Sequence, residues 1–131
     1  MPTFIFDKLV RDKVLDRCLE DPKVRTKYHE LSLEDFKKEL IAKVHEEADE
    51  IPIRSESDDE IISELADVQA VIDALREVYG ITQEQLSHYQ EKKFVKSGGF
   101  EKRAYITSVD LDDDSEWVDI FRAQPYKYKE V

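Results

Sequence analysis

The chain has 131 residues, of which 40% are hydrophobic and 39% are charged, a balance typical of a single globular domain. Its formal net charge of −11 argues against binding to a nucleic-acid polymer, because such binding depends on neutralising many phosphates. No apolar run approaches the roughly 18 residues of a membrane span, so we expect no membrane association. The single cysteine, Cys18, excludes an internal disulfide framework and fits a protein of the reducing cytoplasm.

A basic cluster lies near the start of the chain, where Lys8, Arg11 and Lys13 are interleaved with aspartates. We predict an extended start that leads into a short helix over 12–19, which is stopped by Pro22. On composition alone, the three cations would form surface salt bridges with the neighbouring aspartates.

Two longer helices are predicted next. The first begins after Ser32, a favourable N-cap residue followed by acidic side chains, and runs to about Ile51, where Pro52 ends it. The second begins at the capping-box pattern of 57–60 and ends before Gly80. Because the link between them is short, we expect the two helices to pack antiparallel.

A third helix follows closely. Thr82 is its predicted N-cap, Gln85 can reach back to complete a capping box, and the glycine pair at 98–99 ends the helix. Lys93 and Lys96 share a face with the apolar residues of this helix. Their aliphatic stems can therefore lie along a core while the ammonium groups reach solvent.

The C-terminal part has a different pattern. Segments 103–109 and 116–121 alternate in part between apolar and polar residues, which favours a β-hairpin. Taken with the helices above, this pattern predicts a mainly α protein with one domain over 1–131, built on an antiparallel helix hairpin with flanking helices. Its helical part would run over about 1–103, and an extension would occupy 104–131.

Four acidic residues have unusual positions on the two long helices. Glu47 falls inside the apolar stripe of the first helix, and Glu50 lies on the flank of that stripe. Glu64 falls at the edge of the stripe on the second helix, with Asp67 just outside it. Since residues three apart share a helix face, the two acidic pairs are expected to face each other across the hairpin.

Carboxylates buried between two helices without partners either destabilise the fold or take up protons. Four of them in one place would need cations, and hard divalent ions such as Mg²⁺ or Mn²⁺ suit a site made only of oxygen ligands. The alternative is a solvated acidic face, since this part of the chain is rich in Glu and Asp throughout. The residues alone leave both interpretations open.

Three pieces of sequence, in this order, resemble one enzyme superfamily. They are residues 8–13 (Lys-Leu-Val-Arg-Asp-Lys), the acidic pattern from Glu46 to Asp67, and residues 96–103 (Lys-Ser-Gly-Gly-Phe-Glu-Lys-Arg). Together they are similar to the all-α nucleoside triphosphate pyrophosphatases, the superfamily of MazG and phosphoribosyl-ATP pyrophosphatase, and to its small house-cleaning members. The chain departs from the family pattern at Leu15, where proline is expected, and at Ser97, where arginine is common.

The resemblance implies a MazG-like helical bundle that hydrolyses a nucleoside triphosphate between the α and β phosphates with Mg²⁺ or Mn²⁺. The metal ligands it implies are Glu47, Glu50, Glu64 and Asp67. Glu46 would accept the proton of the attacking water or orient that water. The phosphate contacts it implies are Lys8, Arg11, Lys13, Lys93, Lys96 and Arg103. It also implies a homodimer or a larger homo-oligomer.

Two alternative functions remain at this stage. One is phosphoribosyl-ATP pyrophosphatase of histidine biosynthesis, which has the same chemistry on a different nucleotide. The other is a non-catalytic helical module that binds nucleotides or a protein partner, with its acidic residues solvating the surface. No sequence motif identifies the preferred base or sugar.

Overall fold

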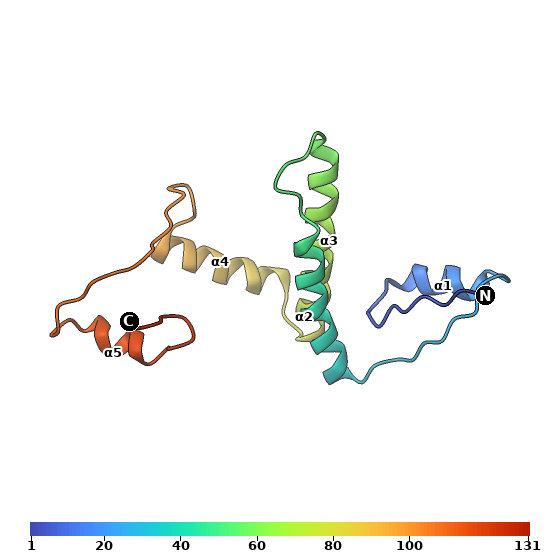
Figure 1. Ribbon diagram of the computed structural model, residues 1–131, viewed down its shortest axis with the longest axis horizontal. Coiled ribbons are helices and arrows are strands. Elements are labelled where there is room, and N and C mark those ends of the chain that lie inside the picture. The colour runs from blue at the N-terminus through green and yellow to red at the C-terminus, as the bar shows by residue number, and fades with distance from the viewer. The chain divides into compact units, whose positions relative to one another are not determined.

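Five helices and no β-strand make up the computed structural model, which describes residues 1–131 (Figure 1). The helices are α1 (Asp12–Glu20), α2 (Leu33–Asp49), α3 (Asp58–Val78), α4 (Gln83–Ser97) and α5 (Trp117–Arg122). The predicted mainly helical class is therefore confirmed. The chain divides into two compact units, Met1–Lys92 and Lys93–Val131, with the division inside α4. No helix combines the length and the apolar character that a membrane crossing requires.

The first two helices begin where the sequence signals place them. α1 starts at Asp12, where a carboxylate in the first turn is favoured by the helix dipole, and it ends at Glu20, one residue beyond the prediction. α2 starts after Ser32, whose Oγ accepts a hydrogen bond from the backbone N of Asp35 at 3.2 Å. The predicted N-cap of this helix is therefore confirmed.

The start of α3 differs from the predicted capping box. Ser57 occupies the N-cap position with an extended backbone, but its side chain makes no capping hydrogen bond. Ser55, in the preceding link, bonds the N-cap amide instead: its Oγ accepts a hydrogen bond from Ser57 N at 3.1 Å and donates one to Glu60 Oε2 at 2.7 Å. The Glu60 carboxylate is thus connected to the Ser57 amide through the Ser55 hydroxyl.

The connection between α3 and α4 follows the predicted pattern. Gly80 has a φ of +67°, a left-handed conformation in which glycine is unstrained, and Ile81 N donates to Arg76 O at 3.0 Å. Thr82 N then donates to Gln85 Oε1 at 2.8 Å, while Gln85 N donates to Thr82 Oγ1 at 3.1 Å. This reciprocal pair is the predicted capping box of α4.

α2 and α3 pack side by side in opposite directions (Figure 1). The centre of their interface consists of Leu40, which is 5% exposed, and Val71, which is 9% exposed. Leu33, Leu65 and Tyr79, which belong to the apolar stripes by their helical spacing, are more than half exposed. The hairpin in a single chain therefore buries only the centre of its two apolar stripes.

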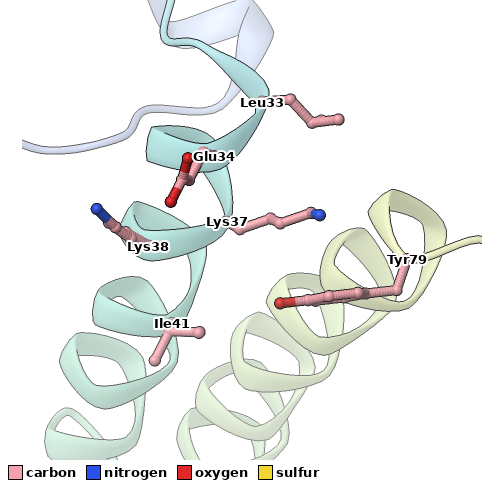
Figure 2. Close-up of a pocket in the computed structure, with 6 residues that line it drawn as sticks. All are labelled: Leu33, Glu34, Lys37, Lys38, Ile41 and Tyr79. Atoms are coloured by element: carbon pink, nitrogen blue, oxygen red, sulfur yellow. The ribbon is translucent and has the colours of Figure 1, made fainter.

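A groove lies at the end of the hairpin formed by the start of α2 and the end of α3. Figure 2 shows the residues that line it: Leu33, Glu34, Lys37, Lys38, Ile41 and Tyr79. Lys37 reaches from α2 toward α3 and places its Nζ 4.7 Å from the centroid of the Tyr79 ring. This cation–π contact joins the two helices at the end opposite to Glu47, Glu64 and Asp67.

The C-terminal unit contains no β-hairpin, in contrast to the prediction. Residues 103–109 form no strand, and the second predicted strand is occupied by α5. Trp117 and Phe121, four residues apart, have ring centroids 5.7 Å from each other, and the ring of Tyr128 lies 4.5 Å from that of Phe121. Ser115 Oγ also accepts a hydrogen bond from Trp117 N. These local contacts favour a helical turn over the extended conformation.

Candidate metal centre

Three carboxylates meet near the link between α2 and α3. Glu47 comes from the end of α2, whereas Glu64 and Asp67 come from the beginning of α3. One carboxylate oxygen of each residue lies within 4.8 Å of the others, and all three residues are half-buried. The antiparallel packing brings the two helix ends together, and the spacing of three residues turns both α3 carboxylates toward α2. We call this group the three-carboxylate cluster.

The cluster holds more negative charge than its neighbours compensate. Burial raises the pKa of Glu47, and the carboxylate of Glu50 raises it further. Lys43 acts in the opposite direction, and Asp67 adds to the increase. Oε2 of Glu64 is buried and has no hydrogen-bond partner. A buried acceptor without a donor destabilises the fold, so the cluster has an unmet requirement for a cation or a proton.

A hard divalent cation fits the three-carboxylate cluster. All of its donors are oxygens, as Mg²⁺ and Mn²⁺ prefer, and one of the carboxylate oxygens, Oε2 of Glu64, is buried without a hydrogen-bond partner. Glu50 is the exposed C-cap residue of α2 and is not one of the three converging residues. The Glu50 carboxylate nevertheless raises the pKa of Glu47.

Glu46 lies beside the cluster and is held by two lysines. Lys43 Nζ donates to Oε1 and Oε2 of Glu46 at 3.2 Å each, and Lys8 Nζ donates to Oε1 at 3.2 Å. Desolvation raises the pKa of Glu46, but the hydrogen bonds from the two lysines outweigh it and hold the pKa below its usual value. The carboxylate of Glu46 is thus fixed in position and kept ionised.

The N-terminal basic cluster reaches the acidic helices. Arg11 Nη2 donates to Asp67 Oδ1 at 2.8 Å across 56 positions of sequence. Lys8 pairs with Glu46 across 38 positions. These partners are distant acids and not the neighbouring aspartates that local composition favoured. Lys13, the third member of the basic cluster, is exposed.

The remaining predicted phosphate contacts belong to the second compact unit. Lys93 and Lys96 are exposed on α4. Arg103 has a φ of +50°, and its N donates to Phe100 O at 3.0 Å in a turn. The contribution of these three residues to a site stays a prediction.

Lys43 is a residue of this region that the sequence patterns did not single out. Its spacing of three residues to Glu46 and four to Glu47 is visible in the sequence and places the three side chains on one side of α2. Burial could not be read from that spacing, and the side chain of Lys43 is only 17% exposed.

No model of a known protein family matches this chain, and no curated protein or solved structure matches it. A functional assignment therefore depends on the residues of the site, on their geometry and on the sequence resemblance described above.

Proposed function

We propose that this chain is a magnesium-dependent nucleoside triphosphate pyrophosphohydrolase that releases a nucleoside monophosphate and pyrophosphate. The supporting observation is the three-carboxylate cluster with its unpartnered Glu64 oxygen, located where the resemblance to the all-α pyrophosphatases implies a metal. Mn²⁺ is the alternative ion because it accepts the same oxygen ligands. The proposed role is the house-cleaning of nucleotide pools in the cytoplasm by a MazG-like enzyme.

In this proposal Glu47, Glu64 and Asp67 hold the metal, and Glu50 lies beside them. The bound ion supplies polarisation of a phosphate oxygen and acidification of water. Glu46 orients the attacking water or accepts its proton. Its hydrogen bonds to two lysines keep the carboxylate ionised and in place for that role.

Lys8 and Arg11 are the proposed phosphate contacts closest to the cluster. Their side chains are 46% and 64% exposed, so they can turn from their carboxylate partners toward an incoming phosphate. A charge-assisted hydrogen bond to phosphate would replace the ion pair that each makes in the unliganded chain. The further proposed contacts are Lys13, Lys93, Lys96 and Arg103.

We also propose that the chain acts as a homodimer or a larger homo-oligomer. Ile62 and Leu65 lie three residues apart on α3, and both side chains are more than half exposed. Apolar side chains gathered on one helix face are typical of surfaces that contact another protein. A second copy of the hairpin is the proposed partner for this face.

The proposal is tested by incubating the purified chain with Mg²⁺ and a panel of ordinary and damaged nucleoside triphosphates, together with phosphoribosyl-ATP. We expect one monophosphate and one pyrophosphate per substrate consumed. Orthophosphate as the only product would contradict cleavage between the α and β phosphates. Selective hydrolysis of phosphoribosyl-ATP would instead favour the histidine-pathway enzyme.

The double variant Glu47→Gln with Glu64→Gln separates catalysis from simple binding. We expect it to lose activity by on the order of 100-fold or more, because two oxygen ligands lose their charge. Calorimetric titration with Mg²⁺ should show a parallel loss of affinity. Glu91→Gln, which removes one exposed carboxylate from α4, is the matched control. Unchanged Mg²⁺ affinity in the double variant would favour a non-catalytic binding module.

A further inference from the structure

Lys43 links two glutamates with different proposed roles. Its Nζ donates to both carboxylate oxygens of Glu46 and lies 3.7 Å from Oε1 of Glu47. The contact with Glu47 is longer than a hydrogen bond and is an ion pair, so Lys43 is hydrogen-bonded to Glu46 and acts on Glu47 through its charge. The lysine side chain is 17% exposed, so neighbouring residues restrict the directions in which it can point.

The position of Lys43 has two opposite effects on a metal centre. The two hydrogen bonds to Glu46 hold that carboxylate in one orientation next to the three-carboxylate cluster. The positive charge near Glu47, in contrast, disfavours a second cation at the same carboxylate. A residue present only to strengthen metal binding would not be positively charged at this place.

We propose that Lys43 is a positioning residue, which orients Glu46 for the proton transfer of the reaction while weakening the affinity of the cluster for Mg²⁺. The inference rests on the metal centre of the proposed function. Lys8, the other lysine that bonds Glu46, comes from the more exposed N-terminal segment and can leave for a phosphate. Lys43 would then be the partner that keeps Glu46 in place during the reaction.

The test compares the full-length wild-type chain with Lys43→Met by calorimetric titration with Mg²⁺ and by steady-state kinetics. We expect Lys43→Met to bind Mg²⁺ roughly two- to fivefold more tightly, because a nearby positive charge is removed. At the same time kcat should fall by about 100-fold with little change in KM, as expected when a proton acceptor is no longer oriented. Lys43→Arg retains the charge and should restore the wild-type Mg²⁺ affinity and part of kcat.

Lys38→Met is the matched control, since it removes an exposed lysine from the same helix and should change neither quantity. If circular dichroism shows that Lys43→Met loses helix, Lys43→Gln replaces it in the same comparison. Equal or weaker Mg²⁺ binding by the uncharged variant would overturn the inference. A wild-type chain that binds Mg²⁺ but hydrolyses no triphosphate would refute the proposed function and, with it, the role of Lys43 in orienting Glu46 for the reaction. The affinity comparison would still decide whether Lys43 weakens Mg²⁺ binding.

Discussion

Adjacent glutamates at the end of α2 have opposite pKa shifts. Glu46 accepts hydrogen bonds from two lysines, which hold its pKa below the usual value despite desolvation. For Glu47, burial raises the pKa, and the Glu50 carboxylate raises it further against the weaker effect of Lys43. Of these two neighbouring carboxylates, Glu46 is therefore the weaker base, and Glu47 takes up a proton more readily.

The raised pKa of Glu47 predicts a pH dependence of stability in the absence of metal. The folded chain binds the Glu47 proton more tightly than the unfolded chain does. The contribution of this residue to the unfolding free energy is therefore present below the usual pKa of 4.5 and is lost as pH rises through the raised value. The affinity for Mg²⁺ should increase over the same range, because the ionised carboxylate is the ligand.

Urea denaturation and Mg²⁺ titration from about pH 4 to about pH 7 would measure these two trends, because this range begins below the usual pKa of 4.5 and extends well above it. The difference between the wild type and Glu47→Gln isolates the contribution of Glu47 from those of other acids. Glu91→Gln, in α4, should leave both trends unchanged. Mg²⁺ affinity that does not vary with pH would count against Glu47 as a ligand.

The helix ends show how local hydrogen bonds position the candidate site. α3 carries two of the three clustered carboxylates within its first three turns, so the start of this helix fixes where they lie. That start depends on Ser55, which connects the Ser57 amide to the Glu60 carboxylate. The link between α2 and α3 therefore helps to position the cluster by fixing the start of α3. None of the three clustered carboxylates belongs to the link itself.

Ser55→Ala should lower the unfolding free energy by about 1 kcal/mol, the usual net contribution of a hydrogen bond, because the Ser57 amide and the Glu60 carboxylate lose their partner. Ser57→Ala should have a smaller effect, because the Ser57 side chain makes no capping hydrogen bond. Urea denaturation monitored by circular dichroism would compare the two variants. A larger loss of stability in Ser57→Ala would show that the predicted capping box, with Ser57 as its side-chain cap, is present in solution.

At the scale of the whole molecule, the chain has a small buried core. Leu40 and Val71 are its buried hydrophobic residues, while many large apolar side chains are exposed. Hydrophobic burial is the main favourable contribution to folding, so we expect the proposed self-association to stabilise the chain by covering exposed apolar side chains. The exposed face that includes Ile62 and Leu65 is the part of the helix hairpin that we propose for this contact.

Sedimentation at micromolar concentration should therefore show a mass of at least twice 15.4 kDa. Ile62→Glu should shift the chain toward the monomer and lower its stability, because a charge would be buried in the contact between copies. Ser63→Glu adds the same charge at the neighbouring exposed position and is the control. A wild-type chain that sediments as a monomer would contradict the proposed self-association.

The sequence by itself was sufficient for the helical part of the fold. Ser32, Thr82 with Gln85, and Gly80 mark helix ends through hydrogen bonds between residues close in sequence, so the signals and their effects lie in the same short segment. The C-terminal segment shows the limit of such patterns. Its partial alternation favoured a strand, but a strand needs a partner, whereas the Trp117 and Phe121 contact forms within one helical turn.

Tertiary structure decided which of the acidic residues come together and which cations approach them. The spacing indicated two acidic pairs, and the packing of α2 on α3 brings three of the four carboxylates together while Glu50 remains exposed. Arg11 and Lys8 meet acids far away in the sequence, a contact that no local rule predicts. Burial raises the pKa of Glu47 and leaves Glu64 Oε2 without a partner, because both effects depend on surrounding atoms that only the folded chain supplies.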